Sequence, residues 1–148
     1  MKDSSYYTRE TMKEDLMKVF REISVKYTCR TQMEAYEETV SHPAPRFYID
    51  ARRAHCVISP MMRGDYTRLE KLSPLRQEMY RALYDTVMRL YQKSTYWKKS
   101  LYYVLQFAIL EPAPRFYISA DRMRLIWKEK TRRRKKEVKN EEAEEDNR

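Results

Sequence analysis

The sequence predicts an all-α fold. Gly64 is the only glycine in 148 residues, whereas an all-β protein would need many more for its tight turns. Helix-forming residues are abundant instead, and apolar side chains recur at the three- and four-residue spacing of amphipathic helices. Because 42% of the residues are apolar, the chain can form a packed core, and we expect a single domain over residues 1–148.

Three helices are expected in the first half of the chain. The first covers about residues 11–27, where Thr11 and Glu14 can form a capping box. The second follows Thr31 as N-cap, and the third begins at Asp50. Their apolar stripes are Met12, Leu16, Val19, Phe20 and Ile23 in the first, Met33, Tyr36 and Val40 in the second, and Ala54, Val57 and Ile58 in the third.

The second half repeats this pattern. Ser73 as N-cap and Pro74 at the first helical position open a helix over about residues 74–93, and Ser100 and Ser119 open two more. The matching stripes are Met79, Leu83, Thr86, Val87 and Leu90, then Tyr102, Leu105 and Ile109, then Met123, Ile126 and Trp127.

We therefore interpret the chain as a tandem duplication of a three-helix unit, packed as one pseudo-twofold domain. The internal repeat covers residues 8–60 and 74–130, and residues 60–72 join the two units. Residues 131–148 form a charged helical extension, in which a basic block precedes an acidic one. That order opposes the helix macrodipole, so we expect fraying there, and the acidic end could fold back over the basic block.

The heptapeptide PAPRFYI occurs twice, at residues 43–49 and 112–118, between the second and third helix of each unit. Its prolines end the preceding helix and hold the chain extended, which predicts a rigid corner. Arg46 and Arg115 are its only charged residues. Each could bind the carbonyl end of the preceding helix or a phosphate, and we favour the structural interpretation.

The sequence offers little for catalysis, so no enzyme activity and no cofactor are expected. One glycine cannot form a glycine-rich phosphate loop. A zinc site from Cys29, His42, His55 and Cys56 is arithmetically possible, but these spacings match no zinc finger. Two cysteines are too few for a disulfide framework, and both are expected to be buried thiols.

The charge predicts a polyanionic partner, because 31 basic residues oppose 22 acidic ones. Between Asp121 and Lys136 there are nine basic residues and two acidic ones. We expect a small non-enzymatic nucleic-acid-binding protein, with DNA favoured over RNA, that contacts phosphates through its basic third helices. The predicted phosphate-binding residues are Arg46, Arg52, Arg53, Lys98, Lys99, Arg115, Arg122, Arg124, Lys128, Lys130, Arg132, Arg133, Arg134, Lys135 and Lys136.

The first two helices and the connection around TCR resemble a helix-turn-helix, but Glu34, Glu37 and Glu38 on the second helix would repel phosphate. In the segment STYWKKS, the aromatic side chains suit base stacking, although we expect Trp97 to fill the core. The helix over residues 100–110 is apolar nearly all round, which requires burial in the core or in a subunit contact. The alternative function is therefore an assembly or adaptor protein that binds a protein partner, or a second copy, through this helix.

The segment RTQMEAYEETV and the second PAPRFYIS resemble parts of short uncharacterised proteins from gut bacteria of the Bacteroides type and their mobile elements. The resemblance covers most of the chain. It implies a bacterial or phage cytoplasmic setting and carries no activity. The N-terminus MKDSSYYTRE also lacks the apolar core of a signal peptide, and no apolar run reaches the roughly 20 residues of a membrane span, so no membrane association is expected.

Overall fold

The computed structural model describes residues 4–26 and 31–146, with side chains over 8–25 and 31–144. Within this part of the chain the regular structure is helical, and the prediction of an all-α fold is confirmed. No described helix combines the length and the apolar content that a membrane crossing requires. The helices are α1 (Ser4–Lys26), α2 (Gln32–Ser41), α3 (Ala51–Met62), α4 (Thr67–Glu70), α5 (Pro74–Tyr91), α6 (Leu101–Ala108) and α7 (Ala120–Asp146).

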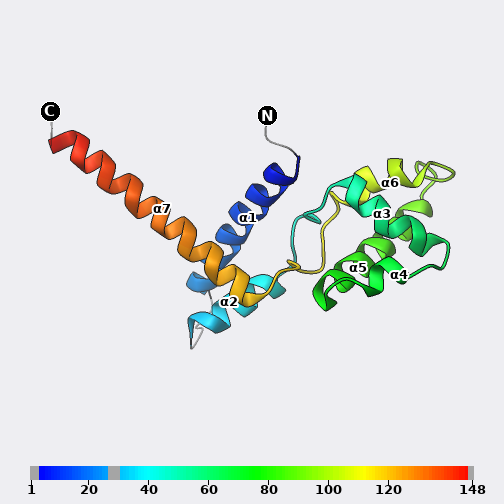
Figure 1. Ribbon diagram of the computed structural model, residues 1–148, viewed down its shortest axis with the longest axis horizontal. Helices are drawn as coiled ribbons and strands as arrows, with labels where there is room; N and C mark the ends of the chain where they lie inside the picture. The colour runs from blue at the N-terminus through cyan, green and yellow to red at the C-terminus, as the bar shows by residue number, and fades with distance from the viewer. Residues whose placement is uncertain (1–3, 27–30, 147–148) are drawn as a thin grey trace.

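The helices form two groups joined by two extended links (Figure 1). One group contains α1, α2 and α7, and the other contains α3, α4, α5 and α6. The third helix of each predicted unit therefore packs in the group formed by the other unit: α3 lies against α5 and α6, and α7 lies against α1 and α2. Among the described residues, α2 and α3 make no contact although they are consecutive.

The links are the two copies of PAPRFYI, and they run antiparallel to each other. Ala44 and Ala113 exchange main-chain hydrogen bonds of 3.0 and 2.9 Å. The amide of Phe47 donates to the carbonyl of Ile109 at 2.9 Å, and that of Phe116 donates to Val40 at 3.0 Å. The predicted extended conformation is confirmed, but the expected corner between neighbouring helices is wrong, because each link carries the chain from one helix group to the other.

Aromatic side chains of the links pack across this junction. The rings of Phe47 and Tyr117 are nearly parallel at 6.4 Å between centroids, and those of Tyr48 and Phe116 at 5.8 Å. Phe47 and Phe116 are buried. The Tyr48 hydroxyl donates a hydrogen bond of 2.6 Å to Asp15 of α1. One hydrophobic core consequently extends from α1 through the links to α6.

Most predicted helix starts are confirmed by capping hydrogen bonds. The hydroxyl of Thr31, Ser73 and Ser100 each accepts from the amide three residues later, and the Asp50 carboxylate does the same. The Thr11 capping box is wrong, because α1 begins at Ser4 and Thr11 lies in its interior. Residues 4–10 contain neither proline nor glycine, so nothing in them stops the helix from extending.

The end of α3 shows what Gly64 does. Gly64 has φ of +81°, its amide donates to Met61, and the amide of Asp65 donates to the carbonyl of Pro60. These are the two hydrogen bonds of a Schellman motif, which favours glycine. Residues 60–72 were predicted as a connection. Instead, α3 extends to Met62 with Pro60 in its last turn, and the short helix α4 follows.

Proline removes one hydrogen bond from α3, and a side chain replaces it. Pro60 has no amide hydrogen to donate to the carbonyl of Cys56, four residues earlier. Arg68 of α4 donates to that carbonyl instead, at 3.2 Å. Cys56 itself is exposed, against the prediction of a buried thiol, because the buried side of α3 is formed by Ala54, Val57, Ile58 and Met61. Cys29 lies outside the described residues.

The predicted apolar stripes form most of the core, and two expectations about burial are corrected. Leu16, Leu83 and Leu105 are fully buried, as expected. Trp97 is 64% exposed rather than buried, because it lies in the turn between α5 and α6. The helix α6 is only half covered, with Tyr102, Tyr103 and Phe107 about 40% exposed.

The helix α7 continues without interruption to Asp146 (Figure 1). The expected fraying is therefore absent from its described length, and the acidic end does not fold back over the basic block. A continuous helix keeps residues ten positions apart about 15 Å from each other along its axis.

Candidate nucleic-acid interface

The first turns of α7 anchor it in its helix group. The Ser119 hydroxyl accepts from the amide of Arg122 at 3.1 Å, which caps the helix. Met123 and Ile126 are buried. The ring of Trp127 lies 4.5 Å from that of Phe20 in α1. Phe20 also stacks on Tyr36 of α2 at 5.2 Å, so these aromatic contacts join all three helices of the group.

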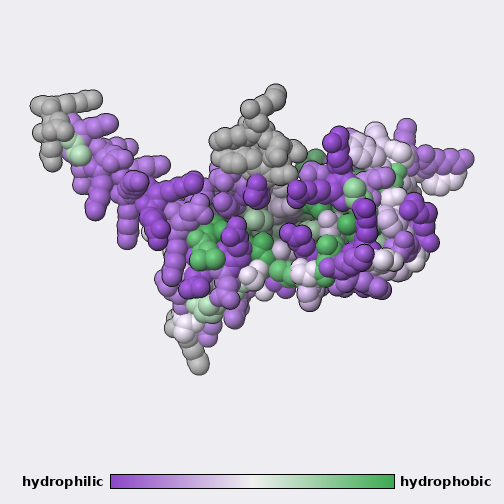
Figure 2. All heavy atoms as spheres, viewed as in Figure 1, coloured by the Kyte–Doolittle hydropathy of each residue, from purple (hydrophilic) through white to green (hydrophobic). Residues whose placement is uncertain are grey.

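Polar contacts complete the anchor one turn later. Lys130 Nζ lies 3.3 Å from a carboxylate oxygen of Glu10 in α1. The hydroxyl of Thr131 donates to the carbonyl of Trp127 at 2.8 Å. From Arg132 to Glu144 every side chain is exposed, and α7 projects away from the group. Figure 2 shows this projecting part as an almost entirely hydrophilic surface.

The exposed basic residues of α7 fall on two sides of the helix. At 3.6 residues per turn, positions separated by three, four, seven or eight residues share one side. One such set forms a continuous row of cations, which we call the basic stripe. It consists of Lys128, Arg132, Lys135, Lys136 and Lys139.

No ion pair involves a residue of the basic stripe within the described part of the chain, whereas cations on the other side of α7 are partly neutralised. Arg133 lies 3.4 Å from Glu129, and Lys130 pairs with Glu10. Glu137 also follows Arg133 by four residues. The basic stripe is therefore the side of α7 on which an external anion meets the least competition.

Two shallow hollows of about 420 Å³ flank α7 where it leaves the group. Beside α2, Tyr36 lies in the same hollow as Lys128, Arg132 and Lys135. Beside α1, the hollow contains Arg21 with Lys130 and Arg134.

Sequence reasoning missed Lys139 and Arg21. Lys139 was assigned to the acidic end, although its position seven residues after Arg132 places it on the same helix side. No sequence pattern points to Arg21, which reaches α7 only through the packing of α1.

The predicted residues do not form one phosphate-binding surface. Arg52 and Arg53 are exposed on α3, in the group that does not contain α7. The expected union of both basic third helices is therefore wrong, because the links send α3 and α7 to different groups. At the start of α7, Arg122 is exposed, while the guanidinium of Arg124 lies 4.0 Å from Asp121.

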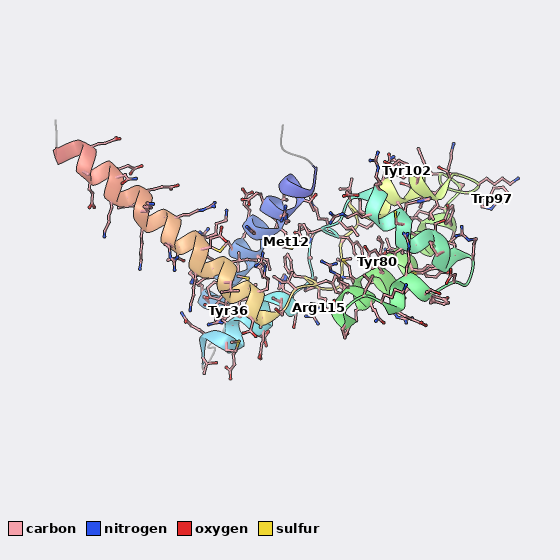
Figure 3. All side chains as sticks on the ribbon, in the orientation of Figure 1. Met12, Tyr36, Tyr80, Trp97, Tyr102 and Arg115 are labelled. Atoms are coloured by element: carbon pink, nitrogen blue, oxygen red, sulfur yellow. The ribbon has the colours of Figure 1, made fainter. Side chains whose placement is uncertain are left out.

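The two link arginines differ from each other. Arg46 is exposed. Arg115 donates to the carbonyl of Phe116 at 3.3 Å, and its guanidinium lies 4.0 Å from the carboxylate of Glu78 in α5 (Figure 3). Arg115 is therefore engaged in local contacts, whereas Arg46 is accessible.

A second surface lies at the far end of the other group, away from α7 (Figure 3). Lys98 Nζ lies 4.5 Å from the ring centroid of Trp97, and Lys99 Nζ lies 5.6 Å from that of Tyr103. Tyr103 contacts Phe107 at 5.2 Å. Cations over exposed aromatic rings form a mixed surface that suits a planar, electron-rich or anionic group. We call these five residues the aromatic patch.

Two other predicted features carry no site. Glu34, Glu37 and Glu38 of α2 are exposed and would repel phosphate, as expected, which makes α2 unsuitable as a recognition helix. The connection TCR before it lies outside the described residues. Among the described residues, no three histidine, cysteine or acidic side chains gather as metal ligands, and the candidate zinc ligand Cys29 lies outside them.

No protein-family model, curated protein or solved structure matches this chain. Its function must therefore be argued from its own side chains. The basic stripe and the aromatic patch are two exposed surfaces whose composition differs from that of an ordinary solvated helix.

Proposed function

We propose that the protein is a non-enzymatic nucleic-acid-binding protein whose contact surface is the basic stripe of α7. The observation that carries the proposal is a row of unpaired cations on a helix that projects from its packing group. A lysine or arginine that contacts a nucleic-acid phosphate releases bound counterions. This contributes affinity that does not depend on the base sequence. The acidic residues beyond Lys139 limit the contact to about three turns of the helix.

Duplex DNA is the preferred partner in this proposal. A single projecting helix fits the major groove of B-form DNA, which is about 12 Å wide. The major groove of A-form RNA is deep and narrow, and side chains cannot enter it in the same way. Phosphate contacts by the basic stripe would fix the position of α7 on the duplex.

The experiment is a fluorescence anisotropy titration of labelled duplex DNA, duplex RNA and single-stranded DNA at several salt concentrations. The variant Arg132→Gln/Lys136→Gln removes two cations of the basic stripe. Its matched control, Arg133→Gln/Arg134→Gln, removes two cations from other sides of the same helix. The stripe variant should reduce the slope of log affinity against log salt by about 2, since each phosphate contact contributes about 0.9.

Equal losses in both variants would show that only net charge matters and would contradict a defined contact surface. Absence of salt-dependent binding by the unmodified protein would refute the nucleic-acid function itself. Tighter binding to duplex RNA than to duplex DNA would overturn the preference for DNA.

We also infer that the chain is a tandem duplication, with repeats over residues 8–60 and 74–130, packed about a pseudo-twofold axis. The reciprocal hydrogen bonds of Ala44 and Ala113 support this inference. So do the ring contacts Phe47–Tyr117 and Tyr48–Phe116, which interchange when one repeat is exchanged for the other. Such an arrangement presents one charged helix, α7, at one end only.

The alternative function is an adaptor that binds a protein partner through α6 and the aromatic patch. The exposure of Trp97 and Phe107 favours it, because exposed aromatic side chains are enriched at protein interfaces. Replacement of Trp97 and Phe107 by serine should then abolish capture of that partner while DNA binding stays unchanged. The corresponding control is Tyr66→Ser, at another exposed aromatic residue.

A further inference from the structure

A third hollow, of about 400 Å³, lies where the two helix groups meet. It is bounded by α1, by both links, by the start of α3 and by α5. Met12 and Tyr80 mark its two sides in Figure 3, one in each helix group. Its lining residues are Thr8, Arg9, Met12, Tyr48, Ile49, Asp50, Arg53, Arg76, Met79, Tyr80, Tyr117 and Ile118.

Most of this lining consists of residues at matching positions in the two halves of the sequence. The links contribute Tyr48 with Tyr117 and Ile49 with Ile118, which are 69 residues apart. The helices contribute Arg9 with Arg76 and Met12 with Met79, which are 67 residues apart. The hollow is therefore built jointly by both halves and exists only when the two groups are assembled.

The charge of the lining is strongly unbalanced. The lining contains three arginines, Arg9, Arg53 and Arg76, all exposed, and one carboxylate, that of Asp50. This carboxylate already accepts a hydrogen bond of 2.8 Å from the amide of Arg53 as the cap of α3. Over the described residues, none of the three guanidinium groups forms an ion pair or a hydrogen bond. Because the three side chains are exposed, solvent screens their mutual repulsion in part, and a bound anion would lower it further.

Tyrosine hydroxyl groups add hydrogen-bond donors to the same place. Burial raises the pKa of Tyr80, while the charges of Arg76 and Arg53, which line the same hollow, lower it. Burial also raises the pKa of Tyr117, so both hydroxyl groups keep their protons at neutral pH. The hydroxyl of Tyr48 is already used in its bond to Asp15.

We propose that this hollow binds a phosphate group. Guanidinium groups donate paired hydrogen bonds to phosphate oxygens, and tyrosine hydroxyl groups can donate to the oxygens that remain. The volume is at the lower end of the range for small-molecule sites, so it can hold more than the phosphate itself. The phosphate can belong to a free mononucleotide or to the backbone of a nucleic acid. The basic stripe is not required for either.

The test is isothermal titration calorimetry of the full chain at low salt with inorganic phosphate, AMP, adenosine and a short single-stranded oligonucleotide. The variant Arg9→Gln/Arg76→Gln removes the matching pair of arginines. The control Arg81→Gln/Arg89→Gln removes two exposed arginines of α5 that lie outside the hollow. We expect phosphate and AMP to bind and adenosine not to bind. Affinity should fall at least about tenfold in the hollow variant and stay unchanged in the control.

The probes distinguish the source of the phosphate. Binding of AMP that is tighter than that of inorganic phosphate indicates a mononucleotide site. Binding of the oligonucleotide that is tighter than that of AMP and of inorganic phosphate, and that is weakened by Arg9→Gln/Arg76→Gln, indicates a backbone phosphate. Binding of no probe, or an equal loss in the control variant, would overturn the proposal. These outcomes are independent of the basic stripe, because Arg132→Gln/Lys136→Gln should leave binding of inorganic phosphate unchanged.

Equilibrium unfolding in urea separates ligand binding from a structural role. Without phosphate, Arg9→Gln/Arg76→Gln should be as stable as the unmodified protein or more stable, because two repelling charges are removed. With phosphate, the unmodified protein should be stabilised and the variant should not, since only the binding-competent native state gains from the ligand. Loss of stability without phosphate would instead assign the arginines to the fold and contradict the proposal.

Discussion

Ala44 and Ala113 hold the two links together through a reciprocal pair of main-chain hydrogen bonds, of 3.0 Å from the Ala44 amide and 2.9 Å from the Ala113 amide. Both residues are 2% exposed and occupy the same position in the two copies of PAPRFYI. Since each link passes from one helix group to the other, this pairing is the point at which the two groups are fixed to each other.

The small side chains at this point should be required for stability. Ala44→Leu and Ala113→Leu would each force a larger side chain into a buried contact and should lower the free energy of unfolding by about 1–3 kcal/mol. Urea denaturation measures the loss. Glu37→Leu, at an exposed position of α2, provides the control and should change stability far less. Equal effects at all three positions would contradict a tight pairing of the links.

The hydrogen bond from Tyr48 to Asp15 should stabilise the attachment of the first link to α1. Tyr48→Phe removes the hydroxyl and leaves the partly buried carboxylate of Asp15 without its 2.6 Å donor. A hydrogen bond to a charged group contributes roughly 1.5–3 kcal/mol, and we expect a loss in this range in urea denaturation. Tyr103→Phe, on the exposed side of α6, should have little effect.

The same tyrosine should give the protein a stability limit in alkaline solution. The pKa of Tyr48 lies well above its ordinary value of 10.0. Burial is the larger cause, and the hydrogen bond to Asp15 is the next. The unfolded chain releases this proton above about pH 10 and the folded chain retains it, so the contribution is complete below pH 10 and is lost as the pH rises further. The stability difference between the unmodified protein and Tyr48→Phe should shrink between pH 9 and about pH 11. A constant difference would refute this assignment.

The pair Glu10 and Lys130 should give α7 an acid-sensitive attachment to α1. Burial alone would raise the pKa of Glu10, but the hydrogen bond and charge of Lys130, together with Lys13, lower it below 4.5. A lowered pKa contributes stability that is present above about pH 4.5 and is lost as the pH falls. Lys130→Met should cost about 0.5–1 kcal/mol at pH 7 and almost nothing at about pH 3, measured by urea denaturation.

Removal of α7 should unfold helices that precede it by about a hundred residues. A chain that ends at residue 118 lacks the helix against which α1 and α2 pack. Hydrogen exchange should show lost protection in α1 and α2 and retained protection in α5 and α6. Protection in α1 and α2 that equals that of the full chain would show that α7 is not part of their core.

Local features of this fold could be predicted from the sequence, and the assembly could not. The caps at Ser73 and Ser100 depend on residues only three positions away, and both were predicted correctly. The apolar stripes also identified the buried sides of α1 and α5. A stripe shows which side of a helix is buried but not which helix covers it, so the placement of α3 and α7 in opposite groups was missed.

The candidate sites follow the same division. The basic segment of α7 is evident from composition, and the helical period completes it with Lys139. The exposure of Trp97 was predicted wrongly, because it depends on where the turn before α6 lies in the assembled protein. The hollow at Arg9 and Arg76 combines residues that are 67 positions apart. They line one hollow only because the two helix groups are assembled across the links.

The exchange of third helices also determines the order in which the protein can fold as it leaves the ribosome. The helices of one group, α3 to α6, have all been synthesised once residue 108 has emerged. The helices α1 and α2 are synthesised first and contact each other, but the third helix of their group, α7, follows last. This group can therefore be completed only at the end of synthesis, and until then the ring of Phe20 lacks its contact with Trp127 and is available to chaperones or to a neighbouring nascent chain.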